Sequence, residues 1–104
     1  LERSFYERIN FGDFLGAQKV LNEMNAMEIP SAKTLQLTLD EKKATRIQTL
    51  IASGNTLYNS GFLQEAISRW NQALALDPDN QTIQQQLERA KKFIGNLERW
   101  KNKS

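Results

Sequence analysis

A spaced set of small, apolar and ring-bearing residues between positions 54 and 78 most constrains the fold of this chain. The set is Gly54, Leu57, Gly61, Ala66, Trp70, Ala73 and Pro78. Small residues stand where two helices would touch, and larger ones flank them at helical spacing. A proline ends the run because its ring cannot continue a helix. The pattern predicts two helices that pack closely and are joined by a tight turn.

The first helix of this pair has both a start signal and a stop signal. Thr38 followed three residues later by Glu41 has the spacing of a capping box, which predicts that the helix begins at Thr38. Apolar residues from Ile47 to Tyr58 then recur every three or four positions. Gly61 suits the left-handed position that follows a helix C-terminus. We therefore expect a helix from Thr38 to the Asn59–Gly61 turn.

Two further helices are predicted downstream. Residues 63–76 form an amphipathic stretch that ends at the turn from Asp77 to Asn80, and its short connection to the preceding helix requires antiparallel packing. Asp79 or Asn80 can cap the next helix, and we interpret Asp77 and Asp79 as turn and capping residues rather than catalytic ones. This last helix is expected to continue through Gly95. Its apolar positions are Ile83, Leu87, Ala90, Phe93, Ile94, Leu97 and Trp100.

The first 30 residues repeat the hairpin less cleanly. Gly12 precedes Gly61, and Ala17 precedes Ala66, by the same 49 residues. Helices are predicted over residues 2–10 and 13–27, and Pro30 closes the unit.

Between the two hairpins, leucines alternate with polar residues. Leu35, Leu37 and Leu39 follow the period of a strand rather than that of a helix. A lone strand would have no partner in an all-helical domain, so we predict an extended connector that lays its leucines on the core. The alternative is a strand that pairs with another chain, or a hinge for domain swapping.

The spacing from Gly54 to Pro78 resembles a tetratricopeptide repeat, a helical hairpin of about 34 residues. With Gly54 at position 8 of that unit, the repeat covers residues 47–80, and Leu50 stands where the family often has tryptophan. Residues 1–30 resemble a degenerate copy, with Phe5 at the glycine position. Residues 31–46 are then a connector and the start of the next helix, and residues 81–102 resemble the capping helix that such arrays require. The resemblance implies one all-α domain of helix hairpins.

The resemblance also implies a function, because these repeats generally bind proteins on the concave face formed by their first helices. Asn55 would hydrogen-bond a peptide backbone, and Tyr58 would offer a flat apolar surface. The alternative is that this face is an ordinary exposed helix edge. Some family members clamp the C-terminal carboxylates of chaperone tails, but Ile51 stands where that clamp needs lysine, which disfavours that role. The concave positions here are Gln48, Ile51, Asn55, Tyr58 and Asn59.

A structural role is the main alternative to partner binding. The apolar positions of the last helix include a second edge, formed by Phe93, Leu97 and Trp100, that would drive self-association if left uncovered. The leucine-rich connector is a second candidate for a homodimer interface.

Composition argues against other classes of function. The chain has no cysteine and no histidine, and it has no phosphate-binding loop or cluster of metal ligands, so we expect no enzyme, cofactor or metal site. With 14 basic and 12 acidic residues the net charge is only +2, and no nucleic-acid partner is expected. No apolar run approaches the roughly 20 residues of a membrane span.

We expect a module of a larger protein, because the chain begins with Leu1. The short motifs at residues 65–70 and 76–80 resemble those of bacterial repeat proteins. The sequence does not distinguish between the cytoplasm and the envelope.

Overall fold

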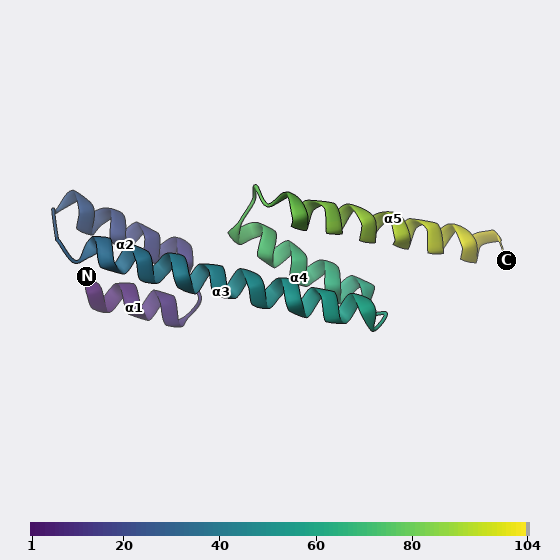
Figure 1. Cartoon of the computed structure of the whole chain (residues 1–104), viewed down its shortest axis with the longest axis horizontal. Helices are drawn as coiled ribbons and strands as arrows, with labels where there is room; N and C mark the ends of the chain where they lie inside the picture. Colours follow the sequence, from purple (N-terminus) through teal and green to yellow (C-terminus); the bar gives the residue numbers. More distant parts are fainter. Residues whose placement is uncertain (104) are drawn as a thin grey trace. The chain divides into compact units, whose positions relative to one another are not determined.

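The computed structural model describes residues 1–103, with side chains as far as Lys101, and its regular structure over that range is entirely helical. Figure 1 shows the helices α1 (Glu2–Asn10), α2 (Phe14–Ala26), α3 (Ala32–Asn59), α4 (Leu63–Leu76) and α5 (Gln81–Lys103). The predicted all-α class is confirmed. The helices predicted over 2–10, 13–27 and 63–76 agree with α1, α2 and α4 to within a residue at each end.

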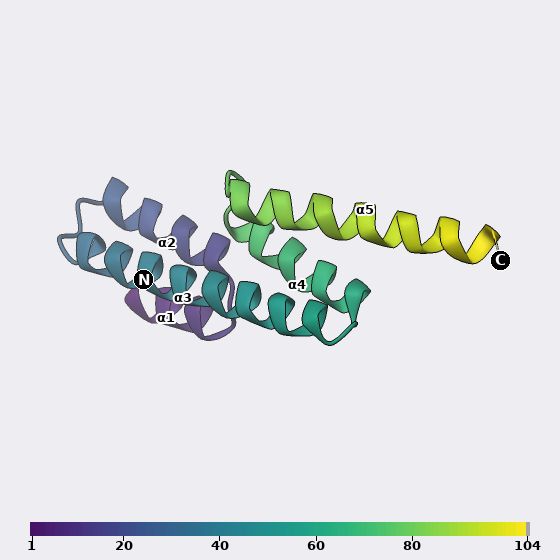
Figure 2. The same ribbon diagram turned by 45° about the vertical axis from the view of Figure 1, so that its right-hand side comes forward.

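The chain divides into two compact units, unit 1 (Leu1–Thr45) and unit 2 (Arg46–Ser104). Their boundary falls inside α3, so this one helix supplies residues to both units. In unit 1, α1 and α2 lie along the first part of α3; in unit 2, α4 lies between the last part of α3 and α5 (Figures 1 and 2). Each unit therefore consists of three helical segments around a core of its own.

The core of unit 1 draws on all three of its helical segments. Phe5, Leu21 and Met24 are completely buried in it. The turn between α1 and α2 is closed by Asp13, whose carboxylate accepts the N–H of Gly16 at 2.9 Å and so satisfies a free donor at the start of α2. The other buried members of this core are Ala17, Val20, Ala32, Leu35 and Leu39.

A pair of amides joins α2 to α3 in unit 1. The Nε2 of Gln18 donates to the Oε1 of Gln36 at 2.9 Å, and the Nε2 of Gln36 donates back to the Oε1 of Gln18 at 3.0 Å. The same two side chains also bond Asn22 and Asp40 on their own helices. Because each amide of the pair is both donor and acceptor, the pair fixes the register of α2 against α3.

The predicted extended connector is wrong, and so is the strand alternative. Residues 32–45 are the first turns of α3, and Thr38 lies inside that helix, where its hydroxyl donates to the carbonyl of Thr34 at 3.4 Å. Leu35 and Leu39 are buried, whereas Leu37 is 66% exposed. Residues four apart share a helix face as well as a strand face, so Leu35 and Leu39 fit both periods. Ala32, three residues before Leu35 and also buried, completes a helical stripe.

In unit 2, the residues of the predicted helix contact form the core. Ala66, Trp70 and Ala73 of α4 are buried, and they pack with Leu50 of α3 and with Ile83, Leu87 and Ala90 of α5. Gly61 has the predicted left-handed backbone, with φ of +88°. Asn80 caps α5, because its Oδ1 accepts the N–H of Ile83 at 3.1 Å. Pro78 lies in the turn before α5, and Leu57 packs at the edge of the core.

At Gly54, α3 lies directly against the Trp70 ring of α4. A Cβ placed on this glycine would lie 2.6 Å from Cδ1 and 2.9 Å from Cε2 of Trp70. Real Cβ atoms do not approach so closely, so the indole ring occupies the space that any larger residue at position 54 would need.

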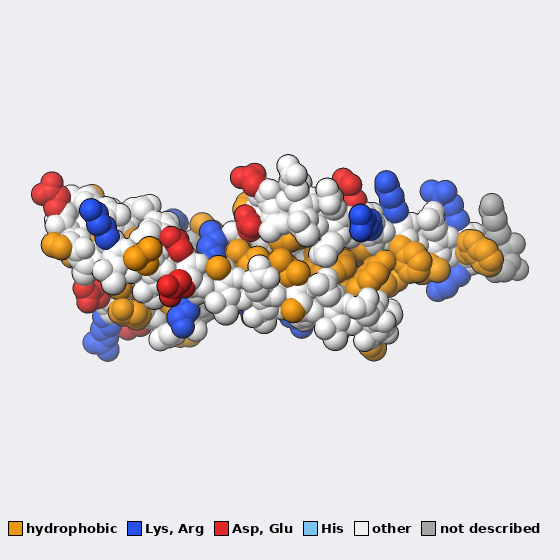
Figure 3. All heavy atoms as spheres, in the orientation of Figure 1, with side chains coloured by type: hydrophobic (Ala, Val, Ile, Leu, Met, Phe, Trp, Pro, Cys, Tyr) orange, Lys and Arg blue, Asp and Glu red, His pale blue; other side chains and the backbone are white. Residues whose placement is uncertain are grey.

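The last helix continues through Gly95 as predicted. Beyond Ala90 its apolar edge is open, since Phe93 is 44%, Leu97 41% and Trp100 79% exposed. Figure 3 shows hydrophobic side chains running along unit 2 toward the end of α5, with basic side chains beside them. Among the helices of residues 1–103, none is long and apolar enough to cross a membrane.

Candidate functional site

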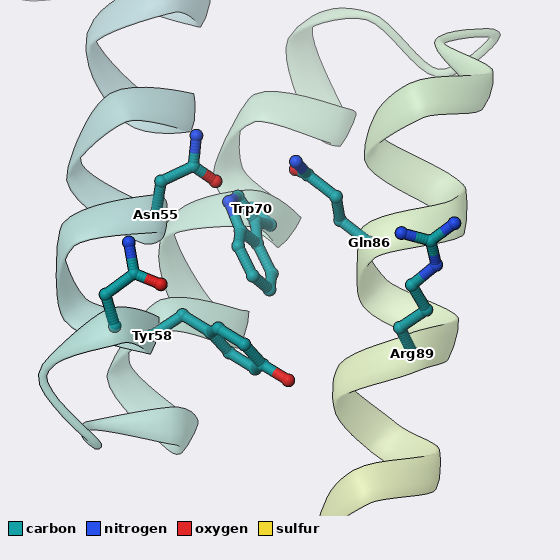
Figure 4. A pocket seen from close by; sticks show the side chains of 6 residues that line it. Asn55, Tyr58, Trp70, Gln86 and Arg89 are labelled. Atoms are coloured by element: carbon teal, nitrogen blue, oxygen red, sulfur yellow. The ribbon is translucent and has the colours of Figure 1, made fainter.

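A cavity of about 320 Å³ opens in unit 2 between the last part of α3 and the first half of α5. Figure 4 shows it from close by, with α4 behind it. The residues that line the cavity are Asn55, Tyr58 and Asn59 from α3, Trp70 from α4, and Gln86 and Arg89 from α5. Its walls are therefore polar, although its floor is an aromatic ring.

Trp70 forms that floor. Its side chain is only 3% exposed, and its ring lies against Gly54 and beside Tyr58, with the two ring centroids 5.6 Å apart. The indole Nε1 is buried and has no acceptor among the residues that the structure describes. The glycine on α3 is what allows so large a ring to sit between the helices.

The polar wall consists mainly of carboxamides. Asn55 and Asn59 are exposed on α3, and the amide of Gln86 points from α5 toward Trp70 (Figure 4). The Oε1 of Gln86 is buried and accepts no hydrogen bond within residues 1–101. A buried acceptor without a donor is costly, at about 1–3 kcal/mol, and is uncommon in proteins. A bound group with an N–H or O–H would remove that cost.

Arg89 gives the cavity its charge. Of the lining residues named above, it alone is a lysine, arginine, aspartate or glutamate. Arg89 is exposed and has no acidic partner within 4 Å among the side chains that the structure describes. Its guanidinium is available for a planar, bidentate contact with an anionic group.

Below the cavity, an aromatic shelf continues along α5. The rings of Tyr58 and Phe93 lie with their centroids 6.4 Å apart and their planes at 59°. Phe93 is 44% exposed, so the outer side of this pair is open to contact. We call the Tyr58 and Phe93 pair the aromatic shelf.

The predicted concave residues are only partly brought together. Asn55, Tyr58 and Asn59 line the cavity, whereas Gln48 is exposed without lining it and Ile51 packs against the core of unit 2. The predicted self-association residues Phe93, Leu97 and Trp100 are exposed on α5.

Two lining residues, Gln86 and Arg89, were not predicted. Arg89 lies 34 residues after Asn55, which is one full repeat length along the predicted pattern. Continuing the repeat register into α5 would have indicated Arg89. The register also reaches Gln86, where clamp members of the family have a basic residue, but a glutamine there gives no such signal.

No protein-family profile matches this chain, and neither a curated protein nor a solved structure shows detectable similarity to it.

Proposed function

We propose that this chain is a non-catalytic protein-interaction domain of tetratricopeptide-repeat type, and that its cavity between α3 and α5 binds a segment of a partner protein. The observation that carries the proposal is the buried, unpartnered Oε1 of Gln86 in a cavity that also holds Asn55, Tyr58 and Asn59. Three positions chosen from the repeat register thus share one cavity with an acceptor that lacks a donor.

The chemistry of the lining suits a polypeptide backbone. Each carboxamide has a donor nitrogen and an acceptor oxygen on one carbon, and each peptide group has one N–H and one C=O. The side chains of Asn55, Asn59 and Gln86 can therefore pair with the backbone groups of an extended segment. Tyr58 adds apolar area together with a polar tip. A cavity of about 320 Å³ is at the small end of typical ligand sites, so we expect it to hold only a few residues of the partner.

A peptide selection tests this proposal. A random display library is panned against the full chain, and the enriched peptides are mapped by ¹H–¹⁵N NMR. We expect shifts at the cavity and a loss of affinity of at least about tenfold for the Asn55→Ala, Tyr58→Ala double variant, consistent with about 1.4 kcal/mol or more of lost contacts.

Gln48→Ala is the matched control, because Gln48 is a neighbouring polar residue of α3 that does not line the cavity. It should bind the same peptides unchanged. Shifts confined to other surfaces, or equal binding by the double variant with its thermal unfolding intact, would refute the proposal.

Self-association through α5 is the second candidate, and the exposure of Phe93, Leu97 and Trp100 favours it. Sedimentation equilibrium at millimolar concentration decides this point. A dimer that Trp100→Ala dissociates supports it, and a strict monomer rejects it.

A further inference from the structure

We infer that the occupant of the cavity is an acidic segment of a partner, bound extended, whose internal carboxylate side chain faces Arg89 and whose apolar side chain rests on the aromatic shelf. This inference rests on the proposed function, and it adds the charge of the bound segment, its conformation and how far it extends along α5. Its starting point is that Arg89 brings a positive charge, without an acidic partner within the described residues, to a cavity that has no negative lining residue.

The cavity and the open edge of α5 lie on one side of that helix. Arg89, Phe93 and Trp100 are spaced by four and seven residues, which places them within about 40° of one another around a helix. Leu97 borders the same edge and is 41% exposed. An occupant of the cavity can therefore continue along Phe93 and Leu97 toward Trp100 without crossing the helix.

The length of this surface sets the length of the occupant. From Arg89 to Trp100 the helix rises about 16 Å at 1.5 Å per residue. An extended segment advances about 3.3 Å per residue, so about five residues span this distance. Side chains alternate along an extended segment, which suits a partner in which acidic and bulky apolar residues alternate.

Charge decides between this occupant and a second copy of the chain. From residue 88 to residue 101, α5 has two acidic residues, Glu88 and Glu98, and five basic ones. The basic residues are Arg89, Lys91, Lys92, Arg99 and Lys101. Glu98 and Lys101 both line a separate groove with Phe62 and Ile94 on the α4 side of the helix. Around the helix, the charged residues nearest to Arg89 are Lys92, Arg99 and Glu88, so this edge has an excess of positive charge. Two copies of the edge brought together would place like charges side by side, whereas an acidic segment complements them.

The test uses two synthetic peptides with amidated C-termini, so that neither has a terminal carboxylate. The first alternates glutamate with phenylalanine or leucine over seven residues, and the second replaces each glutamate with glutamine. Both are titrated into the ¹⁵N-labelled full chain at 50 mM and 300 mM salt. We expect the acidic peptide to shift the amides of Asn55, Gln86, Arg89 and Phe93 and to bind at least about tenfold tighter than its glutamine counterpart at low salt.

Arg89→Gln should remove that tenfold preference while leaving binding of the glutamine peptide unchanged. Lys91→Gln is the control, because it removes an equal charge from another side of α5. Equal affinity for the two peptides at the cavity would overturn the inference and leave the proposed function standing. Failure of both peptides, together with failure of the display library, would overturn both.

A membrane surface is the other acidic partner that the experiment separates. Vesicles containing about one-third phosphatidylserine are mixed with the chain, because a basic helix with an aromatic edge is also typical of membrane-surface binding. Arg89-dependent peptide binding with no vesicle binding supports the inference. Vesicle binding with no peptide binding overturns it, and so does a dimer that binds neither.

Discussion

Unit 1 and unit 2 differ in which helix supplies the large buried ring of the core. Phe5 and Leu21 of unit 1 precede Gly54 and Trp70 of unit 2 by the same 49 residues. In unit 1 the large ring comes from the first helix and is completely buried. In unit 2 the large ring comes from the second helix and lies against a glycine of the first.

The position of the large ring determines what each unit presents at its surface. Because Trp70 reaches across to α3, its ring is the floor of a cavity whose walls Asn55 and Tyr58 supply. The residue 49 positions before Tyr58 is Ile9, which packs against the core of unit 1. Unit 1 therefore has an apolar side chain packed at this position, whereas unit 2 has a polar cavity over an aromatic floor.

The largest expected effects come from removing the two large rings. Phe5→Ala and Trp70→Ala should each lower the free energy of unfolding by about 3–5 kcal/mol, because each leaves a large void. Trp100→Ala, at a position that is 79% exposed, should change it by less than about 0.5 kcal/mol. Urea unfolding followed by far-UV circular dichroism measures all three. A loss below about 1 kcal/mol for Trp70→Ala would show that the ring is not the anchor of unit 2.

Amide hydrogen exchange shows whether the two cores open independently of each other. Phe5→Ala should accelerate amide exchange mainly in α1 and α2, and Trp70→Ala mainly in α4 and α5, because each ring belongs to one core. Uniform acceleration over the whole chain in both variants would contradict the division into two cores.

The next largest effect separates two glycines in helix interiors. Gly54→Ala should destabilise the chain by about 1–3 kcal/mol, because its Cβ would overlap the Trp70 ring. Gly95→Ala should instead stabilise it by about 0.5–1 kcal/mol, since no atom lies within 4 Å of a Cβ there and alanine favours a helix. Thermal and urea unfolding of the two variants provide the measurement. Stabilisation by both substitutions would rule out a tight contact at Gly54.

Smaller effects are expected where helices end. The chain after α2 turns through Glu28, with φ of +57°, whereas the chain after α3 turns through Gly61, with φ of +88°. After both helices the following residue closes the same loop, since Ile29 donates to Met24 at 3.0 Å and Phe62 donates to Leu57 at 2.9 Å. Glu28→Gly should stabilise by about 0.5 kcal/mol and Gly61→Ala should destabilise by about 1 kcal/mol, because left-handed backbone disfavours a Cβ. Destabilisation by Glu28→Gly would exclude strain at Glu28.

The smallest expected effect depends on pH. The N–H of Gly16, and then the guanidinium of Arg8, hold the pKa of Asp13 below its ordinary value of about 3.8. A lowered pKa in the folded state stabilises that state above the unfolded pKa, and this contribution is lost as the pH falls through the folded one. Asp13→Asn should therefore lower stability at pH 7 and lose that difference as the pH falls below about 3.8. A difference that persists unchanged to pH 2 would contradict this assignment.

The sequence predicts the local features of the fold well, because short-range chemistry determines them. Gly61 and Asn80 mark helix ends through their own backbone and side chain, and both act as predicted. The sequence predicts the start of α3 in the wrong place for two reasons. Leu35 and Leu39 fit both the period of a strand and that of a helix, and Thr38 with Glu41 matches a capping box inside a longer helix.

The site is predicted less completely, because it depends on contacts between distant residues. Asn55, Tyr58 and Asn59 follow from the repeat register, but Ile51 shares that register and is turned into the core. Gln86 enters the cavity only because α5 packs against α4. The reciprocal amide pair of Gln18 and Gln36 likewise has no local signature, since it joins separate helices.

The claim that the Trp70 ring occupies space that only a glycine at position 54 leaves open is tested most directly by a double-mutant cycle. It combines Gly54→Ala with Trp70→Leu, which gives unit 2 the leucine that unit 1 has 49 residues earlier. Urea unfolding of the four chains measures the coupling energy. We predict that Gly54→Ala destabilises the wild-type chain but is neutral or stabilising beside Leu at position 70, with a coupling of about 1–3 kcal/mol. Additive effects, with Gly54→Ala equally costly in both backgrounds, would contradict the claim.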